Sequence, residues 1–495
     1  MKSAILFSLL FVLSNVTIVA QQCNCAESFD WMVNTFKTND AGFQYVIDKK
    51  GMDEFTKHSD FYREKALKAT STNDCLTIMN NWLFFFRKGH IGAYLKPELW
   101  QNTQSASLSE LQKDSIRNLY RSEEIIDFTE AQFKEFLKKN GKLNAIEGIW
   151  TSNAYSIGIT RSPEKKNQFI AFIIKADSIY WLPKQKKAEF TLKSDSSFSM
   201  VYSMRDHSKR NEEARLVGDS GSYLLIMNSI WTKVYPVTNP TQKDGLFVKF
   251  RTASSPFIEK LSGSTLYLRI PSFDYSKKKE IDGLLQSHDS LIKSTPNLII
   301  DIRNGTGGSD LSFFKLIPYF YTQPIRSMDF KYFSTELNAQ QYDNWASTIT
   351  DTANSNYCRR VALKMRQNIG SFITLDDTKV SIDSSYTPSA FPRKVAIICN
   401  QYNGSTDEAF LLKAKQSSKV KLFGSPTAGV LDISNIHIVD FPNGQFQLIY
   451  GMTASLGLPA FSIDGVGIQP DYFIDDTIQE EDWINFVQST IEHYE

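Results

Sequence analysis

The sequence predicts a multidomain α/β (α+β) protein, because its hydrophobic pattern changes twice along the chain. The first part carries apolar residues at helical spacing, and the middle part carries short alternating runs separated by charged turns. In the last part fully apolar strands alternate with amphipathic helices. We therefore expect an N-terminal helical domain at 21–145, a β-rich barrel or sandwich at 146–253 and an α/β core at 254–495.

The helical part is predicted from spacings such as Phe29, Met32, Val33 and Phe36, and Gly141 marks the end of its last helix. The middle part is predicted from runs such as 169–174, which follows a charged turn.

The α/β core is predicted from apolar strands that alternate with helices. The expected strands are 266–270, 298–302, 395–399 and 420–423, and the expected helices are about 278–292, 311–320 and 406–414. Fully apolar strands of this kind indicate a sheet covered on both faces. The segment at about 333–384 is poorly patterned and is interpreted as an insertion or lid.

The composition limits the classes of function. The chain has 495 residues, with 55 Lys and Arg against 54 Asp and Glu, so its net charge of +1 provides no basic surface for nucleic acid. Its 42% hydrophobic residues are enough for packed cores. Gly and Pro are ordinary in number, which argues against disorder and collagen-like repeats.

The N-terminus is interpreted as a signal peptide at 1–20. An apolar run at 4–13 follows Lys2, and cleavage is expected near Ala20. The run is too short to span a bilayer, so we expect no transmembrane segment in the mature chain and export to the periplasm or the extracellular space.

The five cysteines form no Cys-x-x-Cys pair, so no zinc site and no cofactor is expected. In an oxidising compartment Cys23 or Cys25 is expected to pair with Cys75, and the odd count leaves at least one free thiol. Cys399 ends an apolar strand and is interpreted as a core residue.

Two loops of the core follow apolar strands directly and open helices, which is where α/β sheets bind ligands. The loop 301–309 has three glycines within four positions, so its backbone N–H groups can converge on an anion, or it forms only a tight turn. The loop 400–408 places Ser405 at a helix N-terminus, where negative charge is favoured. Ser405 is then either a nucleophile or a helix cap completed by Glu408 in a capping box.

A serine nucleophile needs a base, and six histidines are candidates. Four of them have polar, charged or terminal settings, and His437 alternates with Ile436 and Ile438 on a predicted strand. His90 follows Gly89 at the end of an apolar helix, where it can be held rigidly, so it is weakly preferred.

Four ordered motifs resemble those of the C-terminal processing, or tail-specific, serine peptidase family, which includes the tricorn core and retinoid-binding relatives. They span about 266–474, and the short His90 motif adds to them. The motifs are Asp-Ile-Arg-Asn-Gly-Thr-Gly-Gly at 301–308, Asn-Gly-Ser-Thr-Asp-Glu at 403–408, Gly-Ser-Pro-Thr-Ala-Gly at 424–429 and Gly-Val-Gly-Ile-Gln-Pro-Asp at 465–471.

The resemblance implies a ClpP/crotonase-like catalytic core with Ser405 as nucleophile. In one branch of the family a lysine follows the third motif, but this chain has Val430 there, and Lys419 and Lys421 precede the motif. The resemblance therefore favours the tricorn-like branch, in which a histidine is the base, and Gly89-His90-Ile91-Gly92 fits that branch.

In that branch a carboxylate accompanies the histidine. Asp464 stands where this acid is expected, and Asp432 is a second candidate. The N–H groups of Gly308 and Thr406 would form the oxyanion hole. No PDZ carboxylate loop is identified in the middle part, so a preference for C-terminal tails is not carried over.

The resulting hypothesis is an exported serine-type peptidase (hydrolase) that cleaves peptides or unfolded proteins. The alternative is a non-catalytic ligand- or peptide-binding protein on the same scaffold, and an acyl hydrolase acting on esters is a third option. Oligomeric state and substrate sequence cannot be predicted from the sequence.

Overall fold

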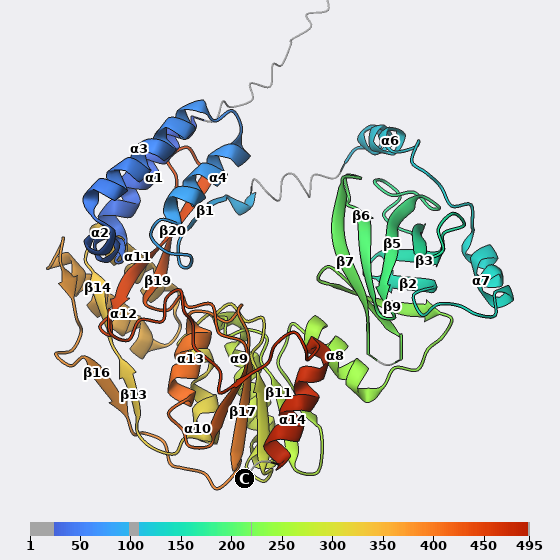
Figure 1. Ribbon diagram of the computed structural model, residues 1–495. Helices are drawn as coiled ribbons and strands as arrows, with labels where there is room; N and C mark the ends of the chain where they lie inside the picture. The colour runs from blue at the N-terminus through green and yellow to red at the C-terminus, as the bar shows by residue number, and fades with distance from the viewer. Residues whose placement is uncertain (1–23, 99–107, 219, 494–495) are drawn as a thin grey trace, which may run out of the picture. The chain divides into compact units, whose positions relative to one another are not determined.

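The computed structural model describes residues 24–98, 108–218 and 220–493, and the chain forms two compact units (Figure 1). The first unit consists of Met1–Trp100, Met328–Ser381 and Val430–Gly465. The second consists of Gln101–Ser327, Ile382–Gly429 and Val466–Glu495. The predicted signal peptide and Cys23 lie outside the described residues.

The helices of the first unit come from two distant parts of the sequence. The N-terminal part supplies α1 (Cys25–Asn39), α2 (Phe43–Lys50), α3 (Met52–Lys68) and α4 (Thr72–Leu83), and the later part supplies α11 (Glu336–Thr348) and α12 (Thr352–Arg366). Phe29, Met32 and Phe36 are buried in one apolar core together with residues of α4, α11 and α12. The helical spacing noted in the sequence thus marks the buried face of α1.

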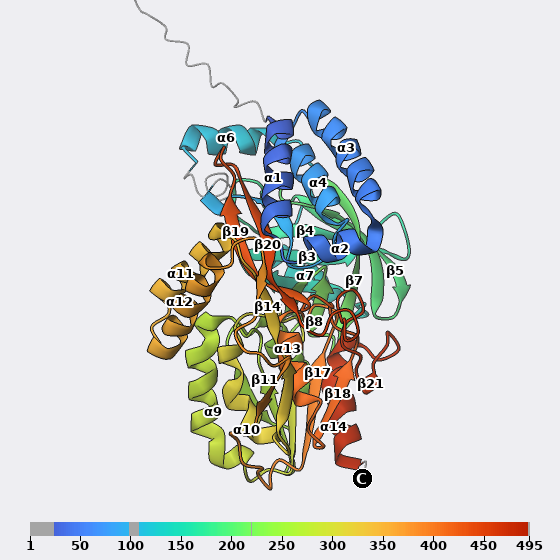
Figure 2. The same cartoon turned by 90° about the vertical axis from the view of Figure 1, so that its left-hand side faces the viewer.

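The sheet of the first unit is built around one long strand, β20 (Phe446–Ser455). Four shorter strands complete the sheet: β1 (Gly92–Leu95), β14 (Phe330–Phe333), β15 (Phe372–Ile373) and β19 (Ile433–Asp440). Strands β19, β1 and β14 each pair with β20 in the antiparallel sense. Figure 2 shows β19 and β20 lying side by side, as their register requires.

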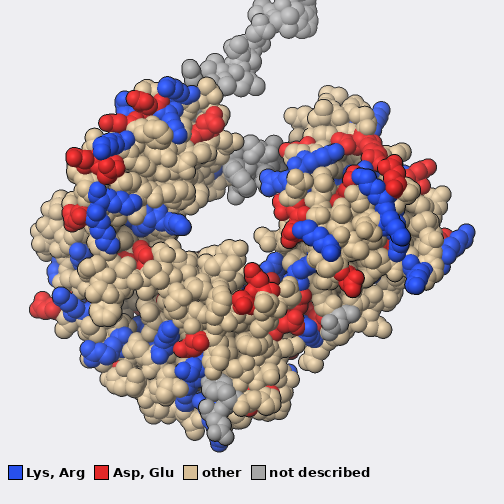
Figure 3. Space-filling view, in the orientation of Figure 1, with Lys and Arg blue, Asp and Glu red and all other residues tan. Residues whose placement is uncertain are grey.

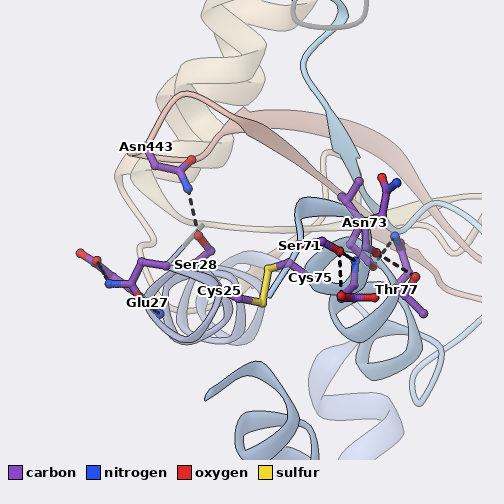
Figure 4. Close-up of a disulfide and its surroundings, with 12 residues drawn as sticks. Cys25, Glu27, Ser28, Ser71, Asn73, Cys75, Thr77 and Asn443 are labelled. Atoms are coloured by element: carbon purple, nitrogen blue, oxygen red, sulfur yellow. Dashed lines mark hydrogen bonds between the residues drawn. A yellow bond between two sulfur atoms is a disulfide. The ribbon is translucent and has the colours of Figure 1, made fainter. Parts of the chain in front are cut away.

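A disulfide joins Cys25 of α1 to Cys75 of α4 and confirms one of the two predicted pairings. Figure 4 shows this bond together with the hydrogen bond from Asn443 Nδ2 to Ser28 Oγ, which is 2.9 Å long. Asn443 lies in the turn between β19 and β20, so α1 is tied both to α4 and to the sheet. Cys358 and Cys399 are free thiols, and both are buried.

The second unit contains a closed antiparallel barrel of eight strands, and the short helices α6 (Glu110–Leu119) and α7 (Glu130–Lys139) precede it. The strands are β2 (Gly148–Ser152), β3 (Tyr155–Arg161), β4 (Gln168–Lys175), β5 (Lys186–Ser194), β6 (Ser197–Ser203), β7 (Lys209–Val217), β8 (Tyr223–Ile226) and β9 (Ser229–Tyr235). Alternate residues such as Phe169, Ala171 and Ile173 point into its core, so the alternation predicted a real barrel.

The second unit also contains the α/β core, whose sheet has the order β10-β11-β12-β17-β18-β21. Its strands are β10 (Phe257–Lys260), β11 (Thr265–Arg269), β12 (Asn297–Asp301), β17 (Lys394–Cys399), β18 (Val420–Gly424) and β21 (Tyr472–Phe473). All neighbours in this sheet are parallel except β10 and β11. Because parallel strands end at one edge, the loops after β12 and β17 emerge together there.

Helices and short turns complete the α/β core. They are α8 (Gln242–Thr252), η1 (Tyr275–Lys277), α9 (Lys278–Ile292), η2 (Asp310–Ser312), η3 (Phe314–Leu316), α10 (Ile317–Phe320), α13 (Thr406–Ala414), η4 (Glu480–Asp482) and α14 (Trp483–His493). Strands β13 (Ile325–Met328) and β16 (Val380–Asp383) contain the points at which the chain passes between the two units.

The fold class expected from the sequence is confirmed: a helical N-terminal region, a β-rich barrel and an α/β core are all present. The compact units group them differently from the predicted domains. Residues 328–381 and 430–465, which the sequence assigned to the core, pack with the N-terminal helices because their apolar side chains share one core with α1 and α4. Helices α6 and α7, which lie within the predicted N-terminal helical domain at 21–145, belong to the barrel's unit.

Acidic and basic side chains are interspersed over the face shown in Figure 3, in keeping with the nearly neutral composition. Among the described residues, no helix combines the length and the apolar character that crossing a membrane requires.

Candidate active site

Ser405 lies in the turn between β17 and α13, and its backbone has an unusual conformation. Its φ is +59° and its ψ is −118°, although a helix cap normally has extended backbone. A non-glycine residue at positive φ costs about 1–3 kcal/mol and persists only where the surroundings impose it. A serine on such a strand-to-helix turn exposes its Oγ, as in the strained turns that carry serine nucleophiles.

Glu408 holds this turn in place. Its side chain is fully buried and accepts hydrogen bonds from the Ser405 N–H at 3.1 Å, the Thr427 hydroxyl at 2.6 Å and the Gly429 N–H at 2.7 Å. The carboxylate half of the predicted capping box is therefore present. The same carboxylate also anchors the segment 427–429, a function that a simple helix cap lacks.

The glycine-rich loop after β12 packs directly on the Ser405 turn. Gly307 has a φ of +88°, and a Cβ added to it would lie 2.8 Å from Gly404 O and 2.9 Å from Ser405 Cβ. Gly308 follows with a φ of +144°, and Ser309 N–H donates to Phe273 O at 2.9 Å. Only glycine fits at 307, because any side chain there would push the serine away.

The N–H groups expected to form the oxyanion hole come from this loop and from the first turn of α13. Within the described part of the chain, the Gly308 and Thr406 N–H groups donate to no acceptor. Thr406 is buried, and its N–H is one of the donors that a helix N-terminus leaves unpaired. Both donors are thus available to an anion.

Asp407 connects the two loops. Its Oδ2 accepts from Asn403 Nδ2 at 2.9 Å and from Gly307 N–H at 3.3 Å, while its buried Oδ1 has no partner among the described residues. Burial raises the pKa of Asp407 to about 7. The site therefore favours the protonated form of Asp407 more than water does.

His90 lies in the first unit, just before β1, with a φ of +55°. Its Nδ1 is 2.6 Å from Ile433 O. Because a carbonyl can only accept, Nδ1 carries the proton and Nε2 keeps its lone pair. Burial lowers the pKa of His90 to about 4, so the ring is neutral at ordinary pH.

Each of the two candidate acids accepts a hydrogen bond from the backbone N–H of the other. Asp432 Oδ2 accepts from Ser462 Oγ at 2.7 Å and from the N–H groups of Ile463 and Asp464 at 2.8 Å. Asp464 Oδ1 in turn accepts the Asp432 N–H at 2.8 Å. The carboxylates thereby fix the turn that precedes Ile433, whose carbonyl contacts His90.

The structure also shows the surroundings of Lys419, which precedes the third motif, and of Val430, which follows it. Lys419 Nζ donates to Ser389 O, so it is engaged on the strand edge before the third motif. Val430 occupies the position of the lysine in the other branch, and its side chain fills the space where Gly89 would otherwise carry a Cβ, with Val430 Cγ1 only 2.2 Å away. Any larger residue at 89 would displace Val430 or the His90 turn.

Three features were missed in the sequence: the three-donor role of Glu408, the buried Asp407 and the Ile433 carbonyl. The capping-box spacing marked Glu408 only as a cap. No sequence signal identifies a backbone carbonyl as a histidine partner, since every residue carries one.

A strained serine at a helix N-terminus, together with two free N–H groups, is typical of serine hydrolases. Residues 264–474 match the model of peptidase family S41, whose members are serine hydrolases. This part of the chain is therefore similar to the peptidases of family S41. The match confirms the resemblance noted in the sequence.

Solved structures to which the chain shows similarity include mature CPAF complexed with lactacystin, at 11% identity and a TM-score of 0.49, covering 94% of this chain and 97% of that one. The photosystem II D1 C-terminal processing protease has 12% identity and a TM-score of 0.35, with coverages of 92% and 95%. The tricorn protease has 12% identity and a TM-score of 0.39, and the match covers 95% of this chain but 36% of that one. No curated protein matches the chain significantly.

Proposed function

We propose that the chain is an exported serine peptidase in which Ser405 is the nucleophile and His90 the general base. The observation that carries the proposal is the Ser405 turn: a serine at a φ of +59°, beside two unpaired N–H groups, within a region that matches family S41. A serine that served only as a helix cap would have no need of this strained backbone.

In the proposed reaction Ser405 Oγ attacks the carbonyl carbon of a peptide bond while His90 Nε2 takes the hydroxyl proton. The N–H groups of Gly308 and Thr406 then hold the oxyanion, and each such donor contributes about 3 kcal/mol in serine peptidases. The C–N bond breaks as His90 returns the proton to the leaving amine. Water subsequently releases the acyl group from Ser405 by the same proton transfers in reverse.

His90 is supported as the base by its tautomer. The contact of Nδ1 with Ile433 O leaves Nε2 as the acceptor, which is the form that a general base requires. The role assigned to a third catalytic residue by the family is proposed here for Asp464 or Asp432, acting through the turn before Ile433. They would be positioning residues, since His90 Nδ1 donates to a carbonyl.

Export is proposed from the apolar N-terminal run and is supported by the Cys25–Cys75 disulfide, which is typical of an oxidising compartment. Sequencing the N-terminus of the secreted protein tests it, with a mature end near Gln21 expected. A mature protein that starts at Met1 would refute export by cleavage.

Catalysis is tested with the variants Ser405→Ala and His90→Ala, each of which should reduce peptide hydrolysis by at least about a thousandfold while the protein stays folded. Ser109→Ala, which removes the serine of the capping box of α6, is the matched control for loss of a cap. His437→Ala removes another histidine whose pKa burial lowers to about 4 and controls for loss of a buried ring.

A serine-reactive phosphonate should label Ser405 in the unmodified protein and fail to label the Ser405→Ala variant. If hydrolysis survives in both variants, Ser405 and His90 are not the catalytic pair. If the unmodified protein neither hydrolyses peptides nor is labelled by the phosphonate, it is instead a binder built on a peptidase scaffold.

A further inference from the structure

Strand β19 is an edge strand, and its free edge begins at the contact with His90. Within the described residues β19 pairs only with β20, so one side of its backbone has no neighbouring strand. Ile433 is the first residue of β19, and its carbonyl accepts from His90 Nδ1.

The hydrogen bonds at the turn between the strands show which groups face outward. Phe441 N–H donates to Phe446 O, and His437 is opposite Tyr450 and Val439 opposite Leu448 in the same register. Bonded pairs in an antiparallel ladder alternate, so the odd-numbered residues from 437 to 441 face β20.

The N–H and C=O groups of Ile436, Ile438 and Asp440 therefore face outward, about 6.8 Å apart along the strand. Among the described residues, no strand pairs with β19 on this outward side. These groups form a row of donors and acceptors that another extended chain can use.

The outward edge lacks the features with which proteins block such strands. From Ile433 to Val439 β19 contains no proline and no charged residue, and Asp440, paired with Lys96, stands at its end. The side chains of Ile436 and Ile438 are 36% and 49% exposed, so both are available to a second strand. An exposed edge of this kind is a hazard unless something pairs with it.

We propose that the free edge of β19 binds the substrate of the proposed peptidase as an added strand. The ligand is an extended, unfolded peptide with apolar side chains at alternate positions, which would pack on Ile436 and Ile438. This inference rests on the proposed function only in that the bound peptide is a substrate, because the edge would bind a peptide whether or not its peptide bond is cleaved.

Two properties of the edge favour a peptide over other occupants. Backbone pairing needs no particular side chains, which suits an enzyme that acts on unfolded chains. The strand that carries the row also begins at Ile433, whose carbonyl accepts from His90, so an added strand would run along the strand that positions the proposed base.

Binding is measured by fluorescence anisotropy with the Ser405→Ala variant and a short labelled peptide that has valine at alternate positions. N-methylation of the peptide at each amide in turn should weaken binding about fivefold or more at every second position and have little effect between them. This alternation distinguishes backbone pairing from binding through side chains.

The edge is located by Ile438→Pro, which removes one outward N–H at a position where an edge strand tolerates proline. It should weaken binding about as much as N-methylation does, whereas Ile438→Thr, which keeps the N–H and the branched side chain, should bind within about twofold of the parent. Circular dichroism and thermal unfolding confirm that both variants are folded.

Equal binding by the proline and threonine variants, or N-methylation without alternation, would overturn the proposal. The proposal would also be overturned if the protein forms dimers that the peptide does not disrupt but that Ile438→Pro dissociates. In that case a second copy of the chain would occupy the edge. Alternating binding without any hydrolysis by the unmodified protein would support the edge and refute the peptidase.

Discussion

The contact between Gly307 and Ser405 predicts a sharp effect of one methyl group. In Gly307→Ala the new Cβ would lie 2.8 Å from Gly404 O and 2.9 Å from Ser405 Cβ, closer than carbon atoms normally approach backbone. The substitution also places a side chain at a φ of +88°. The matched control is Gly221→Ala in the same unit, where φ is +60° and the nearest atom, Ala145 Cβ, is 3.9 Å away.

The two variants share one cost and differ in another. Holding alanine in the left-handed region costs about 1–2 kcal/mol in both. Forcing a methyl group into a packed contact adds about 1–3 kcal/mol in Gly307→Ala alone. Urea unfolding should therefore show a loss of about 1–2 kcal/mol for the control and about 2–5 kcal/mol for Gly307→Ala.

Activity should separate the variants further. Relief of the clash moves the Ser405 turn or the loop that carries the Gly308 N–H, and a displacement of about 1 Å at a catalytic centre costs about a hundredfold in rate. We expect kcat for peptide hydrolysis to fall by about that factor in Gly307→Ala, with little change in the control. If the two variants are equally stable and equally active, the loop does not pack on the serine in the way described.

Three further predictions follow from the disulfide and the buried titrating groups. Replacing Cys75 by Ser should lower the free energy of unfolding by about 4 kcal/mol in urea, since the disulfide links residues 50 apart. The pKa of His90 is lowered from 6.5 to about 4, so between these pH values the unfolded chain binds a proton that the folded protein does not. The free energy of unfolding should therefore fall by up to about 3 kcal/mol as the pH is lowered from 6.5 to 4, and it should fall less steeply in His90→Gln. Asp407 should have the opposite effect, because its pKa is raised from 3.8 to about 7. The free energy of unfolding should fall as the pH rises from 3.8 to about 7, and Asp407→Asn should be more stable than the unmodified protein at about pH 8.

Local patterns in the sequence were sufficient for most of the fold. The spacing of Phe29, Met32 and Phe36 predicted the buried face of α1, and the apolar strands of the core lie within one or two residues of the predicted ranges. Both patterns reflect which residues of a single helix or strand are buried, and this can be predicted from the spacing of apolar residues.

The grouping of elements could not be predicted in the same way. Residues 328–381 and 430–465 are distant in sequence from α1 and α4, yet share their core. Periodicity says that a face is buried, but it does not say against which partner. The segment at 333–384, interpreted as an insertion or lid, supplies α11 and α12 to that core.

In the candidate site, too, some residues could be predicted from the sequence and others could not. Ser405 and the glycines of the loop 301–309 could be recognised because their chemistry depends on residue type. The partner of His90 could not, because it is the backbone carbonyl of Ile433. The sequence predicted Asp464 or Asp432 as the accompanying acid, and both help to build the turn next to that carbonyl.

A carbonyl in place of a carboxylate has a chemical consequence for the proposed base. A carboxylate would stabilise the imidazolium that forms during catalysis, and the pKa of the ring would rise. Ile433 O fixes the tautomer as well as a carboxylate does but carries no net charge, and burial then lowers the pKa of His90 to about 4. The site therefore favours orientation of the base over its basicity. In the proposed mechanism the stabilisation of the transition state must then come chiefly from the oxyanion donors, Gly308 and Thr406, and so from the loop that Gly307 and Asp407 hold against the serine.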